Sequence, residues 1–73
     1  MSNPLEFDIA ETVYALYAVI DSIAERRRAQ KESSDPEIYK GSIHSLACVA
    51  RKLNATLPTP RHDLDEIIAR VMA

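Results

Sequence analysis

Prolines mark where helices can start in this chain. Three of the four prolines directly follow a residue type that caps helices, in the pairs Asn3-Pro4, Asp35-Pro36 and Thr59-Pro60. Proline suits the first helical position because its missing N–H would have no partner there. Asn, Asp or Thr before it accepts a hydrogen bond from the exposed backbone donors. Strand signals are nearly absent, so the sequence predicts an all-α fold with helices at about residues 4–30, 36–55 and 60–72.

The first predicted helix, residues 4–30, carries a wide apolar surface. Its central seam has the alternating four- and three-residue steps of a heptad pattern, in Ile9, Val13, Leu16, Ile20 and Ile23. Further apolar residues flank the seam, namely Tyr14, Tyr17 and Val19. One neighbouring helix needs a narrower stripe than this. We therefore expect the residues of this apolar arc to form an interface with a second chain.

The other two predicted helices also have apolar faces. Residues 36–55 repeat the heptad steps in Tyr39, Ile43, Leu46, Ala50 and Leu53, and residues 60–72 present Leu64, Ile67, Ile68 and Val71. Residues 30–35 form a polar turn, in which Ser34 (with Glu37 in a capping box) or Asp35 caps the second helix. Two long helices joined by a short turn lie antiparallel. We expect an antiparallel helical hairpin plus a short third helix, in a dimeric helical bundle.

The length of the chain argues for association. Its 73 residues form one domain, residues 1–73. A domain of this size buries only about 60% of the surface of its unfolded chain, and small scaffolds add disulfides, metals or partner subunits. Cys48 is the single cysteine, so no disulfide forms within the chain. Since 47% of the residues are hydrophobic, we expect a homodimer.

Charge and hydropathy favour a cytoplasmic protein without a membrane partner. The net charge of −2 selects neither nucleic acid nor an anionic membrane. The longest uncharged run of the first helix, residues 12–20, is far shorter than the roughly 20 residues that span a bilayer. Residues 1–8 carry acids and no base, unlike a secretory signal. A single free cysteine suits a reducing compartment.

Two side-chain pairs suggest chemistry. His44 and Cys48 share a helix face, an arrangement that can activate a thiol. However, no glycine-rich loop and no third orienting group stand near them in the sequence. His62 and Glu66 lie one turn apart, but a structural zinc requires four ligands, mostly Cys and His. We therefore expect no catalytic residue, no metal site, no cofactor and no enzymatic activity.

One basic run lies at the end of the first predicted helix: Arg26, Arg27, Arg28 and Lys31. These residues are candidate anion contacts, and in a dimer two such runs would be paired. The alternative function is thus a nucleic-acid-binding regulator. Against this, Glu25 and Glu32 bracket the run, and no aromatic residues are interleaved with the bases, as single-strand binding prefers. Arg27 also falls on the apolar seam, where its stem can cover apolar surface.

In architecture, residues 1–57 resemble the Rop type of helical-hairpin dimer, a plasmid RNA-binding regulator. The likeness consists of two heptad helices around the acidic turn Glu32-Ser33-Ser34-Asp35. In size and shape the chain also resembles small bacterial and phage-encoded helical hairpins that sequester regulatory proteins by mimicking or capping their dimer surfaces. Neither resemblance assigns functional residues to this chain.

Together these observations predict a small non-enzymatic regulatory or inhibitory protein. It would act by protein–protein interaction through its amphipathic first helix, by helix-in-groove binding or bundle formation. The expected partners are a second copy of the chain and another protein.

Overall fold

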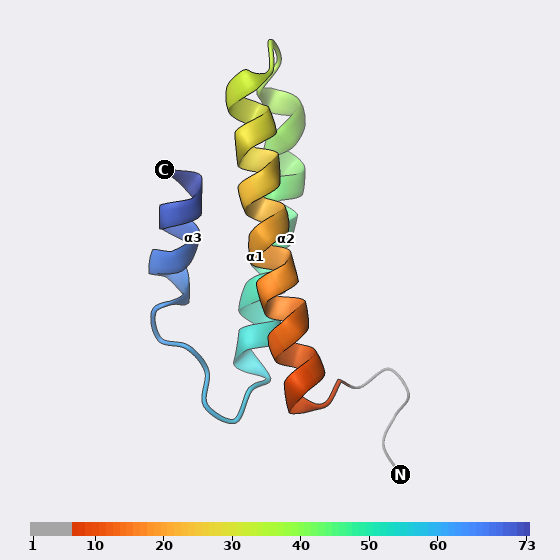
Figure 1. The fold of residues 1–73 in the computed structure, drawn as a ribbon, viewed down its shortest axis with the longest axis vertical. Helices are drawn as coiled ribbons and strands as arrows, with labels where there is room; N and C mark the ends of the chain where they lie inside the picture. Colours follow the sequence, from red (N-terminus) through yellow and green to blue (C-terminus); the bar gives the residue numbers. More distant parts are fainter. Residues whose placement is uncertain (1–6) are drawn as a thin grey trace.

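The computed structural model describes residues 7–73, and these form three α-helices without any strand (Figure 1). Helix α1 spans Ile9–Glu32, α2 spans Glu37–Ala55 and α3 spans Leu64–Met72. Helices α1 and α2 form an antiparallel hairpin, and α3 returns along the side of the hairpin (Figure 1). The prediction of an all-α hairpin with a short third helix is therefore confirmed.

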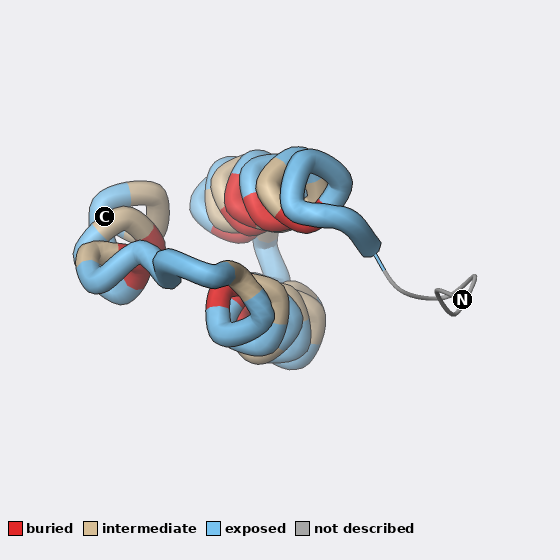
Figure 2. Tube along the Cα trace, turned by 90° about the horizontal axis from the view of Figure 1, so that it is seen from below, coloured by how far each residue is buried: buried red, intermediate tan, exposed pale blue. Residues whose placement is uncertain are grey.

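The core lies between the three helices, which occupy the corners of a triangle when viewed along the bundle (Figure 2). Its buried apolar residues are Leu16, Ile20, Ile23, Ile43, Ala47, Ala50, Leu64 and Ile68. Leu16 and Ile23, which are 1% and 0% exposed, are the largest fully buried side chains. Full burial of such a side chain contributes about 1.5–3 kcal/mol. The heptad seam of α1 thus holds the single chain together.

Helix α1 begins at Ile9, not at Pro4 as the proline pattern predicts. Asp8 is the N-cap: its carboxylate accepts a hydrogen bond from Glu11 N at 2.8 Å, and the Glu11 carboxylate accepts one from Asp8 N at 3.0 Å. This capping box satisfies two backbone donors at once. Residues 7 and 8 precede the helix, and Pro4 lies outside the described residues.

Helix α2 begins at Glu37, within one residue of the predicted start at Pro36. Pro36 already has helical backbone angles, but neither of the predicted side-chain caps, Ser34 or Asp35, makes a capping hydrogen bond. The turn is instead held from α1, because Gln30 Nε2 donates to Pro36 O at 3.1 Å. The predicted end of this helix at Ala55 is confirmed.

Helix α3 begins at Leu64, four residues after the predicted start at Pro60. Asp63 stands at its N-cap but makes no side-chain capping bond. Its two carboxylate oxygens accept instead from Arg61, from Nε and from the guanidinium NH2, each at 2.9 Å. Residues 56–63 therefore form a linker that is fixed by side chains, and α3 has only nine residues.

Buried polar side chains close the ends of the hairpin. Thr12 Oγ1 donates to Asp8 O at 2.8 Å at the start of α1, and Gln30 holds the turn at its end. Asn54 near the end of α2 binds the linker. Within residues 7–73, no buried side-chain nitrogen or oxygen lacks a hydrogen-bond partner. Satisfied polar groups at the helix ends fix where each helix stops.

Candidate functional site

The face of α1 that points away from α2 and α3 carries one continuous stripe of exposed residues. The stripe, here called the α1 outer stripe, consists of Glu11, Tyr14, Ala18, Asp21 and Glu25. At about 100° per residue these positions lie within about 80° of each other around the helix. Tyr14, at its apolar centre, is 78% exposed. The stripe is therefore an acidic amphipathic helix face that no other part of the described chain covers.

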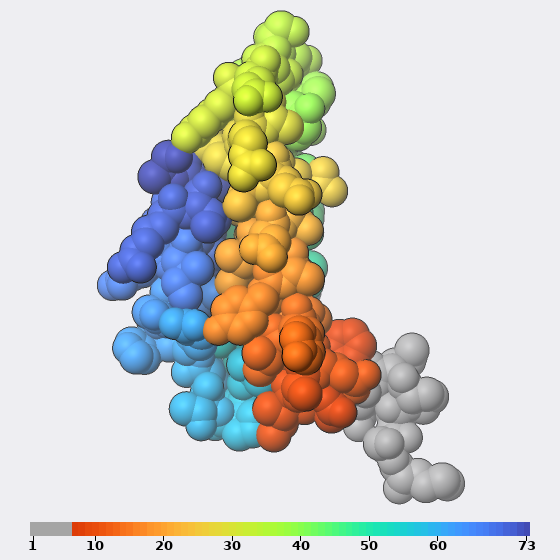
Figure 3. Space-filling view, viewed as in Figure 1, coloured from red at the N-terminus to blue at the C-terminus, as the bar shows by residue number. Residues whose placement is uncertain are grey.

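Tyr17, which is 44% exposed, lies beside the stripe, about 60° around α1 from Tyr14. Phe7 just before α1 and Ile9 at its first position are 57% and 61% exposed, and Ile9 is on the same side of the helix as the buried seam. The first half of α1 lies uncovered on the front of the molecule (Figure 3). A concentration of aromatic and aliphatic side chains on a helix that already has its core contacts is typical of a protein-binding surface.

The predicted interface residues divide into two groups. Leu16, Ile20 and Ile23 are buried in the core of the single chain, and Val19 packs against that core. The sequence prediction for these residues is corrected, because α2 and α3 of the same chain already cover them. Val13 is half-buried, and the exposed remainder is Ile9, Tyr14 and Tyr17. The surface open to a partner is thus narrower than the sequence predicts, and it lies further around α1.

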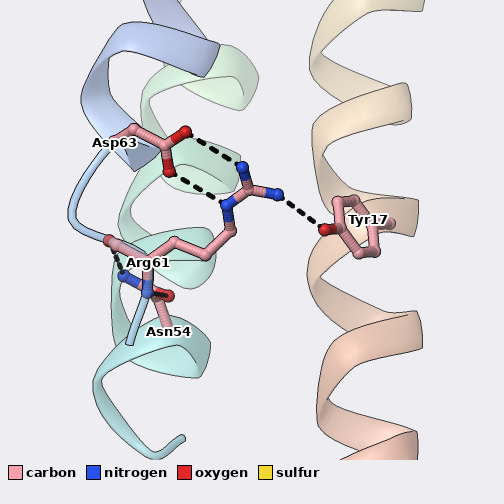
Figure 4. A network of polar contacts seen from close by, with 4 residues as sticks. All are labelled: Tyr17, Asn54, Arg61 and Asp63. Carbon is pink, nitrogen blue, oxygen red and sulfur yellow. Dashed lines mark hydrogen bonds and ion pairs between the residues drawn. The ribbon is translucent and has the colours of Figure 1, made fainter. Parts of the chain in front are cut away.

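Tyr17 also belongs to a polar network that connects α1 with the linker (Figure 4). One Arg61 guanidinium NH donates to the Tyr17 hydroxyl at 2.7 Å, while the same guanidinium makes its two bonds to Asp63. The hydrogen bonds that Arg61 donates, those to Asp63 having the largest effect, raise the pKa of Arg61 above its already high ordinary value. The bonds from Arg61 lower the pKa of Asp63. Both groups are therefore ionised at neutral pH.

Asn54 completes this network from α2. Its Oδ1 accepts from Arg61 N at 2.8 Å, and its Nδ2 donates to Arg61 O at 2.9 Å, so the amide pairs with the main chain of Arg61 (Figure 4). Sequence reasoning did not single out Arg61. The sequence feature that could have indicated its role is that Arg61 is the only arginine in a proline-bounded segment and is followed two residues later by an aspartate.

The basic run at the end of α1 does not form one surface. Arg27 Nε donates to Met72 O at 2.7 Å and its NH1 donates to Gln30 Oε1 at 2.7 Å, while Lys31 Nζ donates to Ala73 O. Cations beside the terminal carbonyls of a helix stabilise it, so these two residues hold the end of α3. Arg26 and Arg28 are exposed about 160° apart around α1.

A groove runs along α2 and α3, and its lining also includes Arg27 and Gln30 of α1. It has a volume of about 380 Å³, and its apolar floor includes Ile43, Ala47, Ile68 and Met72. Arg27, Lys40, His44 and Arg51 surround this floor, and no acidic residue of the described chain lines it. This feature, here called the α2–α3 groove, was not predicted from the sequence.

The two side-chain pairs considered for chemistry lie at the surface. Cys48 Sγ and His44 Nε2 are 3.7 Å apart on α2, as their spacing predicts. No three potential metal ligands come together anywhere between residues 7 and 73, and His62 and Glu66 are both exposed. In the same part of the chain, no helix combines the length and the apolar character needed to cross a bilayer.

Comparison of the chain with protein-family models, with curated proteins and with solved structures finds no match. The likeness to Rop-type hairpins is supported by none of these comparisons and stays a prediction from the helix pattern.

Proposed function

We propose that this chain is a non-enzymatic binding protein that acts by contact with another polypeptide through the exposed side of α1. The observation that carries the proposal is the exposure of Tyr14 at the centre of the α1 outer stripe. A tyrosine offers a large apolar ring and a polar tip, the combination favoured at protein interfaces. The contact would serve self-association and, as in regulatory or inhibitory proteins, capture of a second partner.

The division of the apolar residues between the core and the exposed side of α1 supports this proposal. The core of a chain this small accounts for Leu16, Ile20 and Ile23, yet Tyr14 and Tyr17 remain exposed about 60° apart on the outer side of α1. Burying exposed apolar area contributes roughly 25 cal/mol per Å². A partner on this surface would therefore gain free energy without any rearrangement of the core.

Nucleic acid is not among the partners that we propose. Of the four candidate anion contacts, Arg27 and Lys31 already donate to the end of α3. The exposed Arg26 and Arg28 point to different sides of α1. A phosphate backbone bound by these residues would show a steep loss of affinity with salt, so a salt series with a short duplex is the direct check.

The test is a Tyr14→Ala variant, compared with Ile38→Ala as a matched control. Ile38 is 65% exposed on α2, away from the stripe. We expect Tyr14→Ala to weaken association at least about tenfold, because truncation of an anchoring tyrosine commonly has an effect of this size, and Ile38→Ala to leave it unchanged. The readouts are sedimentation mass across a dilution series and capture of partners from the native host. If the two variants associate and capture partners equally well, the proposal is refuted.

A further inference from the structure

The α2–α3 groove has a basic border that its neighbouring acids only partly neutralise. Lys40 Nζ lies 3.0 Å from Glu37 and Arg51 Nε lies 3.2 Å from Asp65. The side chains of both pairs are largely exposed, and such surface pairs contribute little. Both cations therefore remain available to a better acidic partner that also covers the apolar floor.

Charge is segregated between the two long helices. From Asp8 to Glu25 the chain contains acids and no base, whereas α2 from Lys40 to Ala55 contains bases and no acid. The acids Glu11, Asp21 and Glu25 stand on the α1 outer stripe, and Lys40 and Arg51 stand at the α2–α3 groove. One molecule thus carries both an acidic helix face and a basic groove.

The two surfaces also match in length. Glu11 and Asp21 are separated by ten residues, or about 15 Å along α1, and Lys40 and Arg51 by eleven residues, or about 16 Å along α2. Tyr14 follows Glu11 by three residues, as Ile43 of the groove floor follows Lys40. In a parallel alignment, Glu11 meets Lys40, Tyr14 meets Ile43 and Asp21 lies beside Arg51.

We propose that the α2–α3 groove binds the α1 outer stripe of a second copy of this chain. Tyr14 then covers the apolar floor, and the acids on either side of it replace Glu37 and Asp65 as partners of the basic border. The groove lies away from the stripe, because the α1 residues that line it, Arg27 and Gln30, are about 140–160° around α1 from the centre of the stripe. The contact is therefore head-to-tail, and it propagates from copy to copy unless the copies close into a ring.

Charge favours this arrangement over a symmetric one in which the α1 outer stripes of two copies face each other. A symmetric pairing brings Glu11, Asp21 and Glu25 of one copy onto the same acidic face of the other, where like charges repel. Docking into the groove places each acidic face against a basic surface. This inference rests on the proposed function, because it uses the same exposed side of α1, and it adds the identity of the receiving surface.

The test uses two variants that each remove one side of the contact. The stripe variant, Tyr14→Ala with Asp21→Ala, keeps the groove, and the groove variant, Lys40→Glu with Arg51→Glu, keeps the stripe. Lys52→Glu with Arg70→Glu is a charge-matched control, since both residues are exposed and line neither the groove nor the stripe. Circular dichroism checks that each variant folds, and sedimentation gives the mass of each variant alone and of an equimolar mixture.

We expect the wild type and the control to exceed single-subunit mass in a concentration-dependent manner, with association weakened by salt. Each test variant alone stays at single-subunit mass. Their mixture forms a dimer and nothing larger, because only one intact stripe and one intact groove can meet.

Three results overturn the inference. If the groove variant associates like the wild type while the stripe variant does not, α1 binds elsewhere, and the proposed function survives. If the mixture stays at single-subunit mass, the stripe does not enter the groove. If the wild type has single-subunit mass at every concentration, no second copy binds, and only capture of a different polypeptide through Tyr14 would preserve the proposed function.

Discussion

The Arg61 guanidinium and the Tyr17 hydroxyl, 44 residues apart in sequence, are joined by a hydrogen bond of 2.7 Å. This bond ties the linker to α1, while Asn54 ties the same arginine to α2 through its main chain. The start of α3 is thus positioned by side chains of both helices of the hairpin. The end of α3 is held separately by Arg27 and Lys31.

Replacing Asn54 by alanine should loosen the linker. The substitution removes two part-buried hydrogen bonds, one from the N–H and one to the C=O of Arg61, and at roughly 0.5–1.5 kcal/mol per bond the loss is about 1–3 kcal/mol. Urea unfolding of Asn54→Ala against Thr56→Ala measures it, since the Thr56 hydroxyl makes only an exposed local bond to Leu53 O. An equal midpoint for both variants would show that the amide pairing does not stabilise the fold.

Acid should remove the contribution of Asp63. The hydrogen bonds from Arg61 lower the pKa of Asp63 below its ordinary value of 3.8. A lowered pKa stabilises the fold above the unfolded-state pKa, and this stabilisation is lost as the pH falls through the folded-state pKa. Solvent screens the exposed pair, so the effect is small.

The measurement for Asp63 is the difference in unfolding free energy between wild type and Asp63→Asn across the acid range. The wild type should be the more stable at neutral pH, and the difference should shrink as the pH falls below 3.8. A difference that is constant with pH would mean that the carboxylate charge makes no contribution.

Leu16 and Tyr14 lie two residues apart on α1, but substitution of Leu16 should affect folding and substitution of Tyr14 should affect binding. Leu16 is 1% exposed, whereas Tyr14 is 78% exposed. Leu16→Ala removes buried methyl groups and should cost about 2–5 kcal/mol, a large part of the stability of a domain this small. Tyr14→Ala should leave thermal unfolding of the dissociated chain nearly unchanged. Comparable destabilisation by both substitutions would mean that Tyr14 is part of the core.

Arg27 and Arg28 are adjacent arginines with different roles. Arg27→Ala removes the donor to Met72 O and a cation from the end of α3, and each contribution is roughly 0.3–1.5 kcal/mol. Hydrogen exchange should accelerate at α3 amides and stay constant in the centre of the hairpin. Arg28→Ala, at an exposed position of the same helix, is the control. Protection of α3 that is unchanged in Arg27→Ala would contradict the assigned role.

Three of the five heptad positions of α1, Leu16, Ile20 and Ile23, are core residues, but the heptad steps did not predict which helices cover them. A seam such as Leu16, Ile20 and Ile23 looks the same whether its neighbour belongs to the same chain or to another. The wide apolar arc correctly indicated that α1 needs a second surface, and α3 supplies part of it. The five residues of the α1 outer stripe have the same alternating three- and four-residue steps as the seam, so that stripe was visible in the sequence.

The proline pattern was accurate where no side-chain network competed with helix capping. Pro36 stands next to the observed start of α2, because the turn between the hairpin helices is short. Pro60 precedes α3 by four residues, because Arg61 pairs with Asn54 and draws the Asp63 carboxylate away from capping. Helix-capping preferences do not predict such side-chain pairings, and the α2–α3 groove depends on how the packed helices are spaced, which no local pattern predicts.

The linker network also affects how proteases act on this molecule. A trypsin-like protease cleaves after an arginine only when that side chain enters its specificity pocket. The Arg61 side chain is already held by Tyr17 and Asp63, so the peptide bond after it is protected although the linker is at the surface. Digestion at this bond therefore requires that the linker first detach from the hairpin. The rate of cleavage then reports how often this detachment occurs.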